Sequence, residues 1–316
     1  MLLRLLRALS AIVLLLGAAG PLQPSTAAEE GKWHIVVLVS HDAAPYRDAL
    51  KGFRESISQH GVDAVVEEFN VQRDAMKISA ALEKARHERN RLILTLGTPA
   101  TELAMTESRA LPVVACLVLN TDALSKGNNS TGVVLQVPLK QQFDWMQRVL
   151  RPAAKIAVLY NPRENQARID EAQRIARDAG FELVPILVAT PQILPTALED
   201  AVSRSDALWV IPDSLVVSPE TAKTLLLASF RNRIPMIGLS SAWVKAGALF
   251  ALDWDYEDVG TQCGEVALQI LAGARPGSIA PVNARHTTYA LNLRTAREMR
   301  VDLSESLISS AAQVYE

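Results

Sequence analysis

From Trp33 onward, short apolar runs rich in β-branched residues alternate with amphipathic stretches of helical period, and this alternation limits the folds open to the chain. The clearest example is the run at 34–40, followed by apolar residues at helical spacing from Tyr46 to Ile57 and then by Gly61. A buried strand that leads repeatedly into a surface helix is typical of βαβ units with a parallel sheet. The sequence therefore predicts an α/β fold.

The alternation restarts after the turn-rich residues 126–132. About four strands are expected before this point, and the second series begins with a helix near 141–150 and a strand at 155–160. Two similar series predict two doubly wound, Rossmann-like lobes with parallel sheets. The strands and helix expected after residue 249 are too few for a third core, so we expect them to complete the two lobes.

The chain should then cross between the lobes about three times. We expect lobe 1 at 33–134 plus 256–284, lobe 2 at 135–255 plus 285–304, and a C-terminal tail at 305–316. The expected hinge crossovers lie near 132–137, 252–255 and 283–286.

The first 28 residues resemble a secretory signal peptide. Arg4 and Arg7 precede an apolar run at 8–19, and small residues at 25–28 favour cleavage near Ala28. A run of this length is shorter than the roughly 20 residues that span a bilayer. Because no cysteine stands at the cleavage site to accept a lipid, we expect an exported, periplasmic protein that is not a lipoprotein.

Charge and cysteine content narrow the classes of function further. Lys and Arg number 32 against 34 Asp and Glu, a net charge of -2, so the chain lacks the basic field that would hold nucleic acid. Cys116 and Cys263 are too few for a disulfide scaffold and fit as small core residues, although a bridge forms if they meet in an oxidising compartment. We expect a monomer stabilised by ordinary core burial.

The candidate ligand site follows from the strand ends, because ligands of parallel α/β sheets bind beyond the carboxyl ends of the strands. Mostly hydroxyls, amides and carboxylates follow these ends, which suits a small polar ligand held by many hydrogen bonds. Such residues also cap helices and form turns, which is the structural alternative for each of them. The candidate ligand-binding residues are His41, Asp42, Tyr46, Thr98, Pro99, Asn120, Thr121, Asn161, Asp213, Ser214, Ser240, Ser241 and Asp253. Trp243 and Trp254 could stack on an aromatic ligand.

Motifs of catalysis and of cofactor binding are missing from the sequence. It contains neither a G-x-x-x-x-G-K-[ST] loop nor a G-x-G-x-x-G fingerprint, and its five histidines lack the spacing of metal ligands. Residues 238–242 resemble a nucleophile elbow but lack its closing glycine. We therefore expect no enzymatic activity, no cofactor and no metal.

Several short segments recur in one known family. They are LGTPA at 96–100, NSTG at 129–132, VLYNP at 158–162, ALWVIPD at 207–213, IPMIG at 234–238, DYEDVG at 255–260 and ILAG at 270–273. In their order and spacing, residues 33–301 resemble the ABC transporter substrate-binding proteins that bind tryptophan or tyrosine, which have the type I periplasmic binding protein fold. The chain departs from this family at 120–123, where members usually have an Asp-Pro-Val loop, and in lacking the lipid-accepting cysteine.

The resemblance implies an exported binding protein that closes by a hinge around a small polar ligand, an amino acid or a related metabolite. It implies delivery of this ligand to an ABC transporter permease in the inner membrane. By position in the family, the ligand contacts would be Thr98, Asn120, Asn161, Asp213, Ser240 and Asp253. Two alternatives stay open: a periplasmic sensor that reports to a membrane signalling receptor, and an exported enzyme on the same fold.

Overall fold

The computed structural model describes residues 32–316 apart from 73, 88–90, 109–110, 120–123, 125–127 and 153. The expected signal peptide at 1–28 and the candidate residues Asn120 and Thr121 lie outside the described residues. The helices and strands of the described residues belong to one compact unit, Trp33–Glu316. Among the described residues, no helix has both the length and the apolar character needed to cross a membrane.

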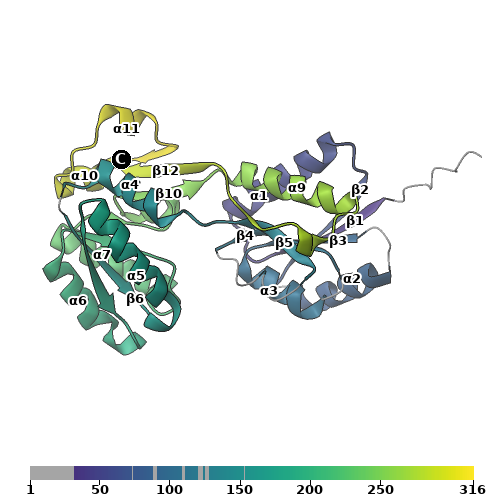
Figure 1. Cartoon of the computed structure of the whole chain (residues 1–316), viewed down its shortest axis with the longest axis horizontal. Helices are drawn as coiled ribbons and strands as arrows, with labels where there is room; N and C mark the ends of the chain where they lie inside the picture. Colours follow the sequence, from purple (N-terminus) through teal and green to yellow (C-terminus); the bar gives the residue numbers. More distant parts are fainter. Residues whose placement is uncertain are drawn as a thin grey trace, which may run out of the picture. The chain divides into compact units, whose positions relative to one another are not determined.

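Sheet A forms the core of lobe 1 and consists of six parallel strands in the order β11-β5-β4-β3-β1-β2 (Figure 1). Its central strands are almost wholly buried and apolar, as expected for a sheet covered on both faces. The strands are β1 (Trp33–Val39), β2 (Ala64–Asn70), β3 (Arg91–Leu96), β4 (Val113–Val118), β5 (Ser130–Val134) and β11 (Val282–Asn283).

Helices cover both faces of sheet A. One face packs on α1 (Ala44–Gln59) and α9 (Tyr256–Leu271), and the other on α2 (Ala75–His87) and α3 (Thr98–Glu107). α1 and α9 approach so closely that a Cβ on Gly260 would lie 1.8 Å from the carbonyl oxygen of Ala49. Only glycine fits at position 260, and this contact packs α9, which comes late in the sequence, against α1.

Sheet B forms the core of lobe 2, in the order β13-β12-β10-β9-β8-β6-β7. The pairing is parallel except between β10 and β12, which are antiparallel, so the predicted all-parallel sheet is parallel-dominated. The strands are β6 (Lys155–Tyr160), β7 (Glu182–Leu187), β8 (Ala207–Trp209), β9 (Met236–Ile237), β10 (Phe250–Trp254), β12 (Thr287–Asn292) and β13 (Gln313–Tyr315).

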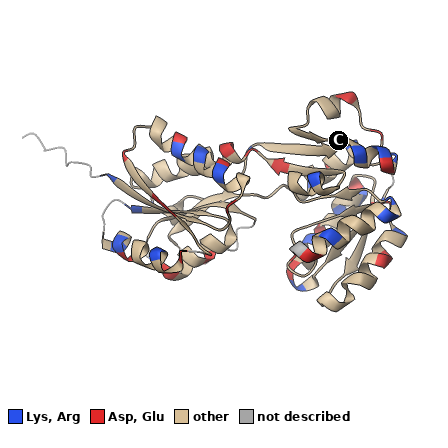
Figure 2. Ribbon diagram, turned by 180° about the vertical axis from the view of Figure 1, so that it is seen from behind, with Lys and Arg blue, Asp and Glu red and all other residues tan. Residues whose placement is uncertain are grey.

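The two faces of sheet B are covered by different helices. α4 (Leu139–Val149) and α5 (Pro162–Asp178) share one buried cluster that includes Phe143 and Trp209, and α6 (Leu194–Arg204) and α7 (Pro219–Asn232) share another. Short elements complete the lobe: α8 (Ser241–Ala246), α10 (Leu293–Met299), α11 (Glu305–Ser309) and the 3-10 turn η1 (Pro191–Ile193), while η2 (Pro276–Ser278) precedes β11. Acidic and basic residues are both scattered over the outer helices (Figure 2).

The chain passes three times between the sheets. It leaves sheet A after β5, returns between β10 and α9, and leaves again between β11 and β12. Residues 305–316, expected as a tail, form α11 and β13, and β13 pairs with β12. The strand β5 lies where the sequence indicates a turn-rich segment, because its residues Ser130, Thr131 and Gly132 are small and polar although buried.

Candidate functional site: a cavity lined by both lobes

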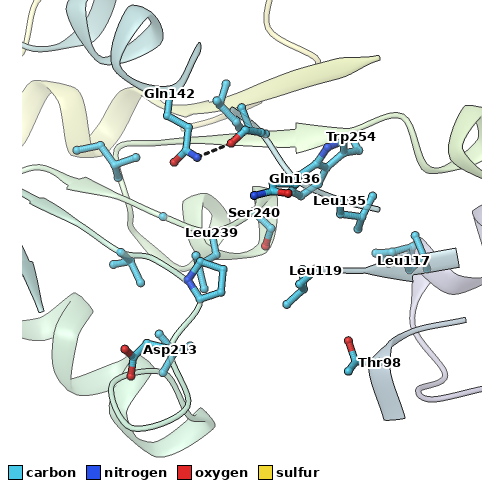
Figure 3. A pocket seen from close by; sticks show the side chains of 18 of the residues that line it. Thr98, Leu117, Leu119, Leu135, Gln136, Gln142, Asp213, Leu239, Ser240 and Trp254 are labelled. Atoms are coloured by element: carbon cyan, nitrogen blue, oxygen red, sulfur yellow. Dashed lines mark hydrogen bonds between the residues drawn. The ribbon is translucent and has the colours of Figure 1, made fainter. Parts of the chain in front are cut away.

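A cavity of about 600 Å³ lies at the carboxyl ends of the strands of both sheets (Figure 3). Its volume falls within the range of small-molecule sites. Figure 3 shows Leu117 and Thr98 on one side and Asp213 and Leu239 on the other, with Leu119 between them. Its lining is mainly apolar and aromatic and includes Tyr46, Leu117, Leu119, Leu135, Val137, Met146, Trp209, Val210, Ile237, Leu239, Phe250, Leu252, Trp254 and Tyr256.

The loop after β3 forms one corner of the cavity. Gly97 has a φ of 92°, and a Cβ there would lie 2.7 Å from Oγ of Ser40, so this turn requires glycine. The Ser40 hydroxyl accepts a hydrogen bond from the backbone N–H of Ala100 at 3.0 Å. These contacts fix the start of α3 and place Thr98 and Pro99 on the cavity wall.

The end of β4 supplies apolar side chains through an irregular strand. Its register with β5 shifts between Ala115 and Val118, and Leu117 has a φ of 58°, which is uncommon for a residue with a side chain. This irregularity brings Leu117 and then Leu119 onto the cavity wall. A sequence analysis that assumes a regular strand does not predict that placement.

Asp213 lines the cavity, but its carboxylate is occupied by donors from the protein. Its Oδ2 accepts from the backbone N–H of Asn161 at 2.6 Å and from Nδ2 of Asn165 at 2.9 Å. Its Oδ1 accepts from the backbone N–H groups of Leu215 and Val216, both at 3.0 Å. Four donors match the capacity of one carboxylate. Asp213 therefore joins the loop after β8 to the start of α5.

Glu164, in the first turn of α5, is engaged in the same loop. Its Oε2 accepts from the backbone N–H of Ser214 at 2.9 Å and from the Ser214 hydroxyl at 2.8 Å. Both residues line the cavity. Asp213 and Glu164 thus both fix the loop after β8 through hydrogen bonds.

Asp253 has a similar role at the passage from lobe 2 to lobe 1. Its Oδ2 accepts from the backbone N–H of Ser241 at 2.7 Å, and its Oδ1 accepts from the backbone N–H of Trp254 at 3.0 Å and from the Tyr256 phenol at 2.5 Å. Burial, together with the charge of Asp253, raises the pKa of Tyr256. The phenol is therefore a stable hydrogen-bond donor at neutral pH.

Two further side-chain contacts lie on the cavity wall, one in lobe 1 and one beside the segment that follows β5. His41 and Tyr46 pack edge to face with their ring centroids 5.7 Å apart, and burial raises the pKa of Tyr46. Gln142, on α4, donates from Nε2 to the carbonyl oxygen of Val137 in the passage after β5, at 2.7 Å (Figure 3). Gln136, beside it, lines the cavity.

The cavity brings together seven of the thirteen sequence-predicted residues: His41, Tyr46, Thr98, Pro99, Asp213, Ser214 and Ser240. Four others lie outside its lining. Asp42 lies in a neighbouring hollow and forms an ion pair with Arg47, while Asn161, Ser241 and Asp253 hold the backbone around the cavity. Trp254 lines the cavity, whereas Trp243 packs against Gly238 in lobe 2.

The apolar lining does not follow from the polar residues after each strand, on which the predicted site rests. Arg168, which lies on α5 and lines the cavity, is not among the predicted residues either. The helical spacing from Glu164 to Arg168 was the available signal, since residues four apart share a helix face. Among the described residues, no group of three or more His, Cys, Asp and Glu side chains could hold a metal ion.

Comparison with known proteins decides the family. Residues 32–315 match the family model described as "ABC transporter substrate binding protein". The chain belongs to this family of substrate-binding proteins. The resemblance stated from the sequence is thereby confirmed.

Relatives and solved structures agree with this assignment. The substrate-binding protein is 26% identical over 266 residues to a tyrosine-binding protein of Clostridioides difficile, covering 79% of this chain and 76% of the relative. A Streptococcus pneumonia ABC domain in complex with L-Trp has a TM-score of 0.68 at 22% identity and covers 90% of this chain and 99% of its own. A ligand-free, open substrate-binding protein with adhesive properties from Clostridium difficile has a TM-score of 0.74 at 19% identity with the same coverages. These similarities confirm the predicted α/β fold of type I periplasmic binding proteins.

Proposed function

We propose that this substrate-binding protein captures a small molecule with an aromatic or apolar body in the cavity and delivers it to an ABC transporter. The observation that supports the proposal is the lining: leucines from lobe 1 and aromatic side chains from lobe 2 surround one volume of about 600 Å³. This modifies the expectation of a small polar ligand held mainly by hydrogen bonds. Tyrosine and tryptophan, the ligands named for two similar proteins, are the first candidates.

A ligand in this cavity would contact both lobes at once. Contacts to both lobes favour whichever arrangement satisfies them together, so binding would shift the protein toward a closed form. We propose that the three passages between the sheets act as the hinges. The closed form would be presented to the permease outside the cytoplasmic membrane, after cleavage of the signal peptide near Ala28.

Leu119 provides a specific test of the ligand's apolar character. Its side chain is 48% exposed and lies in the cavity, whereas Leu187, on β7 outside the cavity, is 49% exposed. Covering a leucine with a ligand stabilises the complex by roughly 1.5 kcal/mol or more. We expect Leu119→Ser to weaken binding about tenfold, and Leu187→Ser to leave it unchanged.

The experiment is a thermal-shift screen followed by calorimetry on the purified protein. L-tyrosine and L-tryptophan should raise the unfolding midpoint and bind one to one, whereas ribose and myo-inositol, which lack an apolar body, should not. Tight binding of a sugar with no effect of Leu119→Ser would overturn the proposed ligand class. Transport is tested by uptake of the identified ligand in cells with and without the protein, and unchanged uptake would contradict delivery to a transporter.

A further inference from the structure

Arg168 is a cation on the wall of a mainly apolar cavity. It belongs to α5, one turn beyond Glu164, and its side chain is partly buried. The neighbouring helix positions Asn165, Ile169 and Ala172 are buried against lobe 2, so Arg168 lies at the border between that core and the cavity. A guanidinium in such surroundings is costly unless an anion accompanies it.

Arg168 has no carboxylate partner among the described residues. Its buried Nε makes no hydrogen bond to any residue that the structure describes. Glu164 is the expected partner four residues earlier, but its Oε2 is engaged by Ser214, and Asp213 is engaged by four protein donors. Burial lowers the pKa of Arg168, and the charge of Glu171 acts in the opposite direction. The guanidinium keeps its charge at neutral pH because an arginine cannot be deprotonated in proteins.

We propose that Arg168 binds a carboxylate of the ligand. The planar guanidinium matches a carboxylate in shape and charge, and a ligand carboxylate in the cavity would accompany a charge that no described carboxylate pairs. This inference deepens the proposed function and rests on it: the ligand class becomes a carboxylic acid with an aromatic or apolar body. Arg168 then determines specificity for the acid over its neutral derivatives.

The test compares acids with their amides, which differ only in the charged group. Wild-type protein is titrated by calorimetry with L-tryptophan, L-tryptophanamide, L-tyrosine and L-tyrosinamide. We expect the acids to bind about 100-fold more tightly than the amides, since a partly buried charge pair is lost with the amide. Arg168→Gln should weaken acid binding by a similar factor and change amide binding far less, which brings the ratio of the two dissociation constants near one.

Two further variants distinguish the loss of the Arg168 charge from a nonspecific effect of substitution on the protein. Arg174→Gln, on an exposed position of the same helix outside the cavity, should bind like the wild type. Arg168→Lys keeps the charge but loses the paired donors, so it should retain part of the preference for the acid. Equal binding of acids and amides by the wild type would overturn the role of Arg168 and leave the proposed function standing. Binding of neither class would overturn the proposed function and this inference together.

Discussion

The phenol of Tyr256 donates a 2.5 Å hydrogen bond to Oδ1 of Asp253 across the point where the chain leaves sheet B for lobe 1. Asp253 is the penultimate residue of β10, and Tyr256 is the first residue of α9. The bond therefore joins the last strand residues of one lobe to the first helical turn of the other.

Tyr256→Phe should lower the free energy of unfolding by about 2 kcal/mol, because a buried carboxylate loses one of its donors. Urea unfolding without ligand measures this loss. Tyr315→Phe is the matched control, since the Tyr315 hydroxyl donates to Gln313 at an exposed position and its removal should cost less than about 0.5 kcal/mol. Equal losses in the two variants would contradict a structural role for the Tyr256 bond.

Alkaline pH should destabilise the wild type through the same residue. Burial and Asp253 raise the pKa of Tyr256 above its ordinary value of 10.0, so the folded protein keeps a proton that the unfolded chain releases. The stabilisation is complete below pH 10 and falls above it by about 1.4 kcal/mol per pH unit from this group. Urea unfolding at pH about 8 and about 11 should show the advantage of the wild type over Tyr256→Phe shrinking as the pH rises. A constant difference would rule out this linkage.

Asp213→Asn should destabilise the ligand-free protein by about 2 to 3 kcal/mol. An amide nitrogen would face N–H donors that now point at a carboxylate oxygen, leaving buried groups without partners. Asp170→Asn on the exposed face of α5 is the control, since Asp170 accepts a surface hydrogen bond from Gln166. If Asp213→Asn kept full stability and lost only ligand affinity, Asp213 would instead contact the ligand directly.

The thiols of Cys116 and Cys263 should be inert in the folded, reduced protein. Both are buried, and burial together with the adjacent Cys116 raises the pKa of Cys263, so the reactive thiolate is suppressed. A chromogenic disulfide reagent should label neither thiol natively and should label both in urea. Rapid native labelling would contradict this burial. Protein isolated from an oxidising compartment that labels only after reduction would show that the pair had formed a disulfide.

Much of the fold could be predicted because its signals are local. The strand at 155–160 is an apolar run between helical patterns, and the structure places β6 at the same residues. β5 could not be predicted in this way: Ser130, Thr131 and Gly132 are typical of a turn, and only the neighbouring β4 and β11 make them a buried strand.

Local sequence patterns predict only part of the candidate site. The sequence placed Thr98, Asp213 and Ser240 at the strand ends, and all three line the cavity. Whether a carboxylate is available to a ligand depends on its donors, and those of Asp213 come partly from residues about fifty positions earlier in the chain. Arg168 can pair with a ligand only if Glu164 does not pair with it. Ser214 donates two hydrogen bonds to Glu164, and no local sequence pattern indicates this contact.

The late return of the chain to lobe 1 has a consequence for the order of assembly. α9 and β11 complete the first lobe, yet they lie after almost all of the second lobe in the sequence, and Gly260 fits against Ala49 only once both are present. A nascent chain that ends before Tyr256 would leave the apolar face of α1, including Phe53, uncovered. The first lobe therefore cannot complete its core until α9 and β11 are available, so its folding waits for nearly the whole chain.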